Sequence, residues 1–260
     1  SDLPGVRIRR MPGISADANS GSAPAPEAAS GATDDGPGQN APALARNAVE
    51  FANANGEALL SIVLVHQPGA AIEALPVPMT FAVPASAPDA AEAAAAYRAA
   101  GLEVALIPDL PAGARAQDVA VALDVNLSDI SGAVALIDAT GEVFQGNRAA
   151  VAQIVAAAAG TGHGVVTRAQ GLDSAGRLAD REGVAAARIY AQIEPGETDR
   201  GAISRALDRA AFRARSDGRL ILSGTGSPEH LSAILAWALE NRDGDVTLAP
   251  LSAVLQSAAR

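Results

Sequence analysis

The stretch from Leu59 to Val65 constrains the fold more than any other part of this sequence. It reads Leu-Leu-Ser-Ile-Val-Leu-Val, nearly all apolar with several β-branched residues, which is typical of a strand buried on both faces. The next four residues, from His66 to Gly69, predict a tight loop. In a parallel α/β protein the loops at the carboxyl ends of strands face the functional mouth, so we expect functional side chains in this loop.

Composition excludes several classes of protein. Hydrophobic residues make up 49% of the 260 residues and aromatic residues only 3%, so the chain can bury a sizeable core that is mainly aliphatic. The formal net charge of -10 argues against a nucleic-acid partner, because no surface of basic side chains is available to release counterions. The absence of cysteine excludes thiolate catalysis, disulfides and cysteine-ligated zinc.

Two parts of the chain differ in character. Residues 1–42 are rich in Ala, Gly, Pro, Ser and Asp and predict a disordered linker, whereas residues 43–260 have the pattern of one folded domain. Within the linker, Val6–Met11 alternates apolar and basic residues, so it is either a solvated tether or a segment that adds to a sheet edge or an acidic partner. The chain begins at Ser1 without a leader pattern and contains no run of about 18 apolar residues. We therefore expect membrane attachment only through an upstream anchor that has been removed.

Strands and helices alternate through the folded domain. Strands are predicted at Leu59–Val65, Met79–Val83, Glu103–Ile107, Ala133–Ile137, Val165–Thr167, Ala187–Ile193, Arg219–Ser223 and Val246–Leu248. Helices are predicted at Pro88–Ala100, Ala116–Ser128, Asn147–Ala159, Asp173–Glu182, Asp199–Asp217 and Pro228–Asn241. Such alternation gives βα units and a parallel sheet, and about seven units without a break favour one barrel over two domains.

Glycine-rich segments and histidines give no independent catalytic motif. Gly160–Gly164 follows a helix and leads into a strand, which is the reverse of a dinucleotide-binding loop. Gly224–Gly226 lies between a strand and a helix, but Ser227 and Pro228 after it form an ordinary helix start. The three histidines have no metal-binding spacing, and no Gly-x-Ser-x-Gly elbow is present.

Polar side chains follow several of the predicted strands. Because the carboxyl ends of parallel strands meet at one mouth, these side chains are candidates for a pocket that binds a hydroxyl-rich ligand. The alternative is that loops at strand ends are polar only because solvent surrounds them. The candidates are His66, Gln67, Asp109, Asp138, Glu194 and Thr225.

The region from about Leu59 to Leu239 resembles the divergent polysaccharide deacetylases, which are relatives of the NodB-type carbohydrate esterases. The landmarks that carry the resemblance are Ser61–Val65, Pro78–Pro84, the Ala-Ala-Gly-Leu-Glu-Val run around Gly101, and Ser223–Glu229. The resemblance implies an α/β fold, an irregular NodB-like (β/α) barrel of about seven parallel strands. It also implies an exported protein of the bacterial periplasm or cell envelope.

The family's reaction is metal-assisted removal of an acetyl group, with zinc or another divalent metal held by residues after several strands. An Asp-Asp pair is expected after the first strand, where this chain has His66 and Gln67. The other expected ligands fall near Ile107, Asp138-Ala139, Thr167, Thr225 and Ser227. Catalytic zinc needs at least three protein ligands, and the Ile, Ala and Thr side chains at these positions do not supply them. We therefore expect the family fold here without its metal site.

These departures predict a catalytically degenerate member without a cofactor. Its mouth would bind a glycan, such as peptidoglycan or another polysaccharide, or dock a cell-wall-associated protein. One alternative is an active de-acetylase, with or without a metal, built around His66, Asp109 and Asp138. A second alternative is an interaction scaffold that works through the Arg-rich Val6–Met11 segment.

Overall fold

Strand β1 (Ala58–Val65) pairs with three other strands and is the hub of the fold. β7 (Arg219–Thr225) runs parallel to it along nearly its whole length. On its other side, the carboxyl half of β1 pairs with β2 (Thr80–Pro84) and the amino half pairs with β8 (Val246–Leu248). β2 and β8 therefore share one edge of β1, and the β1–β2 pairing closes the sheet.

The computed structural model describes residues 41–70, 72–111, 113–139, 141, 148–168, 173–242 and 244–258. Within them, β1 to β7 follow one another around a barrel, all parallel, and β7 returns to β1. The remaining strands are β3 (Glu103–Ile107), β4 (Ala133–Ile137), β5 (Gly164–Arg168) and β6 (Ala186–Gln192). The predicted irregular barrel of about seven parallel strands is confirmed.

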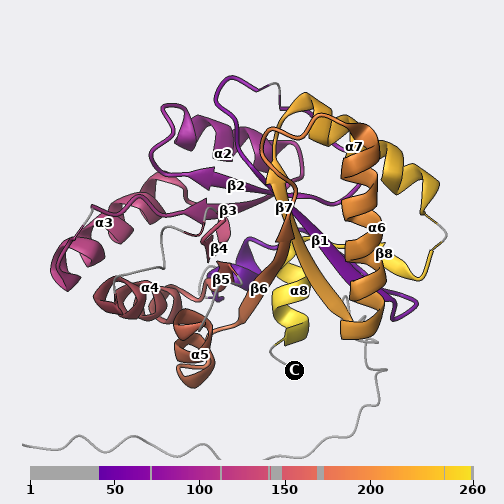
Figure 1. Cartoon of the computed structure of the whole chain (residues 1–260). Coiled ribbons are helices and arrows are strands. Elements are labelled where there is room, and N and C mark those ends of the chain that lie inside the picture. Colours follow the sequence, from indigo (N-terminus) through magenta and orange to yellow (C-terminus); the bar gives the residue numbers. More distant parts are fainter. Residues whose placement is uncertain are drawn as a thin grey trace, which may run out of the picture. The chain divides into compact units, whose positions relative to one another are not determined.

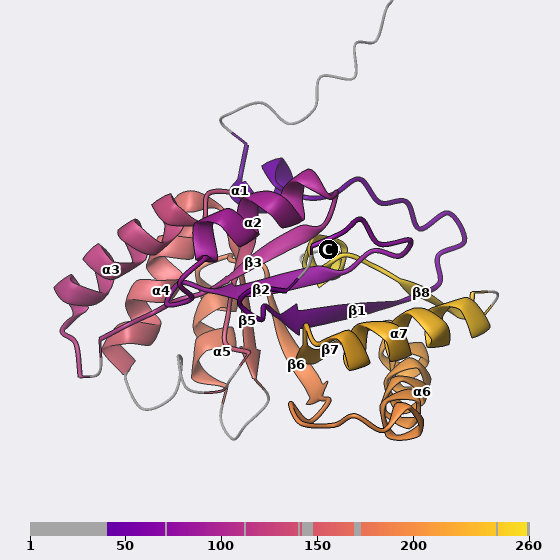
Figure 2. The same cartoon turned by 90° about the horizontal axis from the view of Figure 1, so that it is seen from above.

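Helices cover the outside of the barrel (Figure 1). They are α2 (Ala90–Ala99), α3 (Ala116–Asp129), α4 (Arg148–Thr161), α5 (Ser174–Arg181), α6 (Arg200–Asp217) and α7 (Pro228–Glu240). Figure 2 shows α3, α4 and α5 on one side of the barrel and α6 and α7 on the other. No helix in the described ranges is both long and apolar enough to cross a membrane.

The alternation of side chains along β1 sorts them into two layers. Leu60, Ile62 and Leu64 belong to the buried cluster that β-strands share with the outer helices. Leu59 and Val63 belong to a second cluster inside the barrel. Both faces of the strand are covered, and every residue from Leu59 to Leu64 except the buried Ser61 is apolar. Each fully buried Leu or Ile stabilises the fold by ~1.5–3 kcal/mol.

A further helix, α8 (Leu251–Ala258), fills the amino-terminal end of the barrel. Its Leu251 and Leu255 are part of the interior cluster. The Leu251 N–H donates to Thr80 Oγ1 (3.1 Å), and the Ser252 N–H donates to Glu103 Oε2 (3.0 Å). The first residues of β2 and β3 therefore cap this helix, and the Glu103 carboxylate lies where the helix dipole favours negative charge.

Two helices were not predicted from the sequence. They are α8 and the short α1 (Ala43–Arg46), which lies in the lead-in to the folded domain. The other elements agree closely with the predicted ranges. The predicted linker lies outside the described residues except for its last two positions, and Val6–Met11 lies wholly outside them, so the domain boundary stays a prediction.

Candidate functional site

Four of the predicted site residues follow the carboxyl ends of barrel strands with side chains that solvent reaches. Gln67, Asp109 and Glu194 are exposed, and Thr225 is half-buried. They come after β1, β3 and β6 and at the end of β7, respectively. The carboxyl mouth therefore carries amide, carboxylate and hydroxyl groups, which can bond a hydroxyl-rich ligand.

His66 also follows β1, but its ring is turned outward toward α2. The side chain is buried, with 2% of its surface exposed. Nδ1 lies 2.9 Å from Tyr97 Oη on α2, and Nε2 lies 3.1 Å from Oδ1 of Asp89, the residue just before α2. Both ring nitrogens therefore already have protein partners.

The surroundings of His66 assign its protons. Burial, and then the charge of Asp89, raise the pKa of Tyr97 to about 12, so the phenol keeps its proton in its contact with Nδ1. Because the Asp89 carboxylate can only accept, Nε2 carries a hydrogen and donates to Asp89. The Gly69 N–H donates to the other oxygen of Asp89 (3.1 Å), and this bond, followed by the bond from His66, lowers the pKa of Asp89. The Tyr97 ring also stacks on Phe81, with centroids 4.0 Å apart.

The loops after β1 and β7 touch at the mouth. The Gly226 N–H donates to the Val65 carbonyl at 2.8 Å. A Cβ on Gly226 would lie 3.2 Å from Val65 O and 3.9 Å from Gln67 N, which leaves little room for any side chain. This approach of two backbones places the candidates Gln67 and Thr225 in neighbouring loops.

His230 holds Thr225 in place from behind. Its Nδ1 accepts from the Thr225 N–H (3.1 Å), and its Nε2 donates to the Glu197 carbonyl (3.0 Å). The side chain is fully buried in the first turn of α7, three residues after the cap Ser227. The sequence gives His230 no metal-binding spacing, and the structure shows it as a packed histidine that ties the loops after β6 and β7 to α7.

Asp138 is buried at the end of β4, with 1% of its surface exposed. Its backbone N–H donates to Val166 O in β5, and its Oδ1 accepts the Gly141 N–H at 2.7 Å. Asp138 therefore holds the start of the loop that follows β4. Residues 142–147 of that loop lie outside the described residues.

Thr167 stands where the family resemblance implies an aspartate. Its hydroxyl donates to Asp173 Oδ2 at 3.0 Å, and Asp173 Oδ1 accepts the Gly176 N–H at 2.8 Å. Arg188 Nε lies 3.8 Å from the same Oδ2. Asp173 begins the helix predicted at Asp173–Glu182, and it also links β5, α5 and β6.

The donors in the described residues do not fit a catalytic metal. Such a site needs at least three converging ligands, and the described parts of the chain contain no group of three or more His, Asp or Glu side chains able to hold an ion. Both nitrogens of His66 and of His230 are bonded within the protein. His163 lies at the opposite end of the barrel, just before β5. The described residues of this mouth therefore do not supply the ligands that a metal-assisted step needs.

Comparison with known proteins gives one family and two similar folds. The sequence matches the divergent polysaccharide deacetylase family over residues 65–255. An uncharacterized protein from Agrobacterium tumefaciens C58 has a TM-score of 0.72 at 19% identity, covering 82% of this chain and 94% of that chain. A proposed cellobiose-phosphate cleavage protein from Enterococcus faecalis V583 has a TM-score of 0.55 at 11% identity, covering 77% and 98%. At these identities the two likenesses concern the fold alone. No curated protein matches the sequence at a significant level.

Proposed function

This chain belongs to the divergent polysaccharide deacetylase family, and we propose that it is a catalytically degenerate member that binds a glycan at its carboxyl mouth. The ligand is peptidoglycan or another polysaccharide. The protein acts in the bacterial periplasm or cell envelope, where such a polymer is met.

The observation that carries this proposal is the engagement of His66. This histidine occupies the strand end where the family resemblance implies metal-binding aspartates, yet Tyr97 and Asp89 hold both of its ring nitrogens. Releasing the ring for a metal would leave the Tyr97 hydroxyl buried without its partner, at a cost of ~1–3 kcal/mol. The geometry therefore favours binding over metal-assisted hydrolysis.

The exposed residues of the mouth supply the binding groups. Gln67 offers an amide that donates and accepts, while Asp109 and Glu194 offer carboxylates that accept from sugar hydroxyls. The Asp109 backbone N–H is held by Asn126 Oδ1 of α3 at 2.8 Å, so this carboxylate extends from a fixed position. Preorganised polar groups of this kind reduce the ordering cost of binding.

A calorimetric titration with the tetramer of N-acetylglucosamine tests the proposal. The variants are Gln67→Ala and Asp109→Ala, with Asp124→Ala on the exposed surface of α3 as the matched control. We expect saturable binding by the wild type, weakened about three- to tenfold by each mouth variant, the equivalent of one hydrogen bond of ~0.5–1.5 kcal/mol. The control should bind as the wild type does.

Three results would contradict the proposal. The first is the absence of saturable binding to both this probe and purified peptidoglycan. The second is an equal loss of affinity in the α3 control. The third is acetate release from the probe together with stoichiometric zinc, which would establish catalysis in place of binding.

A further inference from the structure

Strands β6 and β7 are paired at their carboxyl ends and separate toward their amino-terminal ends. Their pairing begins at Ile189↔Ile221 and extends only toward the carboxyl ends. Before that point, Ala186–Arg188 is paired with β5 alone, and Arg219–Leu220 has its strand partner on the β1 side. Figure 1 shows the two strands diverging with α8 between them. Among the described strands, each of these two segments therefore has one backbone edge without a strand partner.

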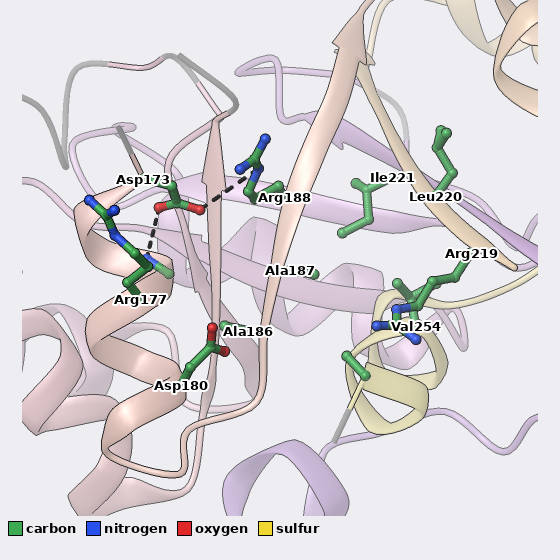
Figure 3. A pocket seen from close by; sticks show the side chains of 12 residues that line it. Asp173, Arg177, Asp180, Ala186, Ala187, Arg188, Arg219, Leu220, Ile221 and Val254 are labelled. Atoms are coloured by element: carbon green, nitrogen blue, oxygen red, sulfur yellow. Dashed lines mark hydrogen bonds and ion pairs between the residues drawn. The ribbon is translucent and has the colours of Figure 1, made fainter. Parts of the chain in front are cut away.

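The opening between the strands is a cavity of about 550 Å³. This volume lies within the range of ligand pockets, ~300–1,000 Å³. Its walls include the small or apolar side chains of Ala186, Ala187, Ile221 and Val254, as Figure 3 shows. The small alanines leave space next to the free edge of β6.

Opposite charges lie on the two sides of this opening. In Figure 3, Asp180 of α5 extends into it from one side, and Arg219 of β7 extends into it from the other. Within the described part of the chain, Arg219 Nη1 donates to the Ser257 carbonyl at 3.2 Å, and no ion pair joins Arg219 to Asp180. A cation beside Asp180 and an anion beside Arg219 would each meet a complementary charge.

The charged residue of β6, Arg188, already has a partner. Arg188 lies against Asp173, which also caps α5. Arg177 of α5 also lines the opening and is exposed, but its side chain extends away from it in Figure 3, so Asp180 and Arg219 are the exposed charges that point toward an entering ligand. The ligand class must therefore combine a positive end, a negative end and a middle that bonds to backbone edges.

We propose that this opening binds a short extended peptide with free termini and small side chains. Its ammonium group pairs with Asp180 and its carboxylate pairs with Arg219, so its main chain crosses the opening beside the edges of β6 and β7 that have no strand partner. Side chains of alanine size match the apolar walls. The site uses none of the mouth residues and lies toward the other end of the strands, so it is independent of glycan binding.

The probe is the tripeptide Ala-Ala-Ala, titrated into the full chain at low ionic strength and followed by calorimetry. Its N-acetylated and C-amidated forms remove one terminal charge each. We expect the free peptide to bind saturably, and each blocked form to bind about fivefold more weakly, the effect of losing one exposed ion pair. Hydrogen exchange should slow in residues 186–188 and 219–220 when the free peptide is present.

Two variants test which side chains bind the amino and carboxyl termini of the peptide. Asp180→Asn should abolish the preference for a free amino end and keep the preference for a free carboxyl end, and Arg219→Gln should do the reverse. Arg213→Gln is the matched control, because it removes a charge from the exposed Arg213–Asp217 pair on α6. Thermal unfolding checks that Arg219→Gln still folds without the bond from Arg219 to the Ser257 carbonyl. If it does not fold, Asp180→Asn still tests the proposal on its own.

The proposal is overturned if the free tripeptide shows no saturable binding at millimolar concentration. It is also overturned if neither variant changes the discrimination between free and blocked peptides, or if the α6 control changes it equally.

Discussion

Asp89 bonds to His66 and to the loop that follows His66. Its Oδ1 lies 3.1 Å from His66 Nε2, and its Oδ2 accepts the Gly69 N–H at 3.1 Å. This pair of contacts fastens the end of β1 to the start of α2. The histidine at the most prominent strand end is therefore a positioning residue for the mouth, and its role can be tested without any metal or ligand.

Substitution of His66 should destabilise the metal-free protein. His66→Ala removes a buried ring, leaves a cavity against Tyr97, and deprives the phenol of its partner. We expect a loss of ~2–4 kcal/mol in the free energy of unfolding, measured by urea denaturation. Gln67→Ala, one residue further along and exposed, should change stability by less than ~0.5 kcal/mol. Equal and small effects of both substitutions would remove the structural role assigned to His66.

The phenol of Tyr97 should lose its proton only at unusually high pH. Its pKa is raised to about 12 by burial and by Asp89, so the native state keeps a proton that the unfolded state releases from about pH 10 upward. Stability should therefore fall as the pH rises from 10 toward 12. In a Tyr190→Phe background, which leaves one tyrosine, phenolate absorbance should appear near pH 12 in the folded protein. Appearance near pH 10 in protein that is still folded would be inconsistent with the buried phenol.

Glu103 should be required for docking of α8. Its carboxylate accepts from the backbone N–H groups of Ser252 and Val49 and from the hydroxyls of Ser252 and Thr80. In Glu103→Gln, the amide NH₂ must face one of the two N–H donors, which then has no acceptor. We therefore expect the free energy of unfolding, measured by chemical denaturation, to fall by ~1–3 kcal/mol. Glu50→Gln, at an exposed position, is the control. A Glu103→Gln protein as stable as the control would show that these four bonds do not hold the helix.

His163 should make the protein sensitive to mild acid. Burial, and then the nearby Arg46, lower the pKa of His163 to about 4, from 6.5 for the unperturbed group. The unfolded chain therefore takes up a proton below pH 6.5 that the folded chain refuses, and stability is lost as the pH falls from 6.5 to 4. The difference in unfolding free energy between wild type and His163→Gln should change by about 2–3 kcal/mol over this range. A difference that is constant with pH would contradict the lowered pKa.

The sequence predicts most of the barrel because its strands are buried on both faces. Such strands are continuous apolar runs, and turn residues such as Pro108 and Gly101 mark where elements end. Helix α8 escaped prediction because the groups that cap its first turn come from far along the chain. Thr80 and Glu103 lie 171 and 149 residues away from their partners Leu251 and Ser252. No local pattern carries that information.

The candidate site was predicted less completely, and the orientation of His66 is the clearest example. The sequence places His66 correctly at the end of β1, and from that position we predicted that its side chain belongs to the mouth. However, alternation puts His66 on the same face as Leu60, Ile62 and Leu64, which pack outward beneath the helices. Applied to His66, this two-residue alternation predicts that the imidazole ring points outward, toward the helices. Its partners Tyr97 and Asp89 could not be foreseen, because they depend on how α2 packs.

Zinc titration of the wild-type protein, followed by calorimetry beside His66→Ala, tests the central claim most directly. The account predicts no stoichiometric zinc site that depends on His66, because Tyr97 and Asp89 occupy its two nitrogens. Binding of one zinc ion per chain that disappears in His66→Ala would contradict it.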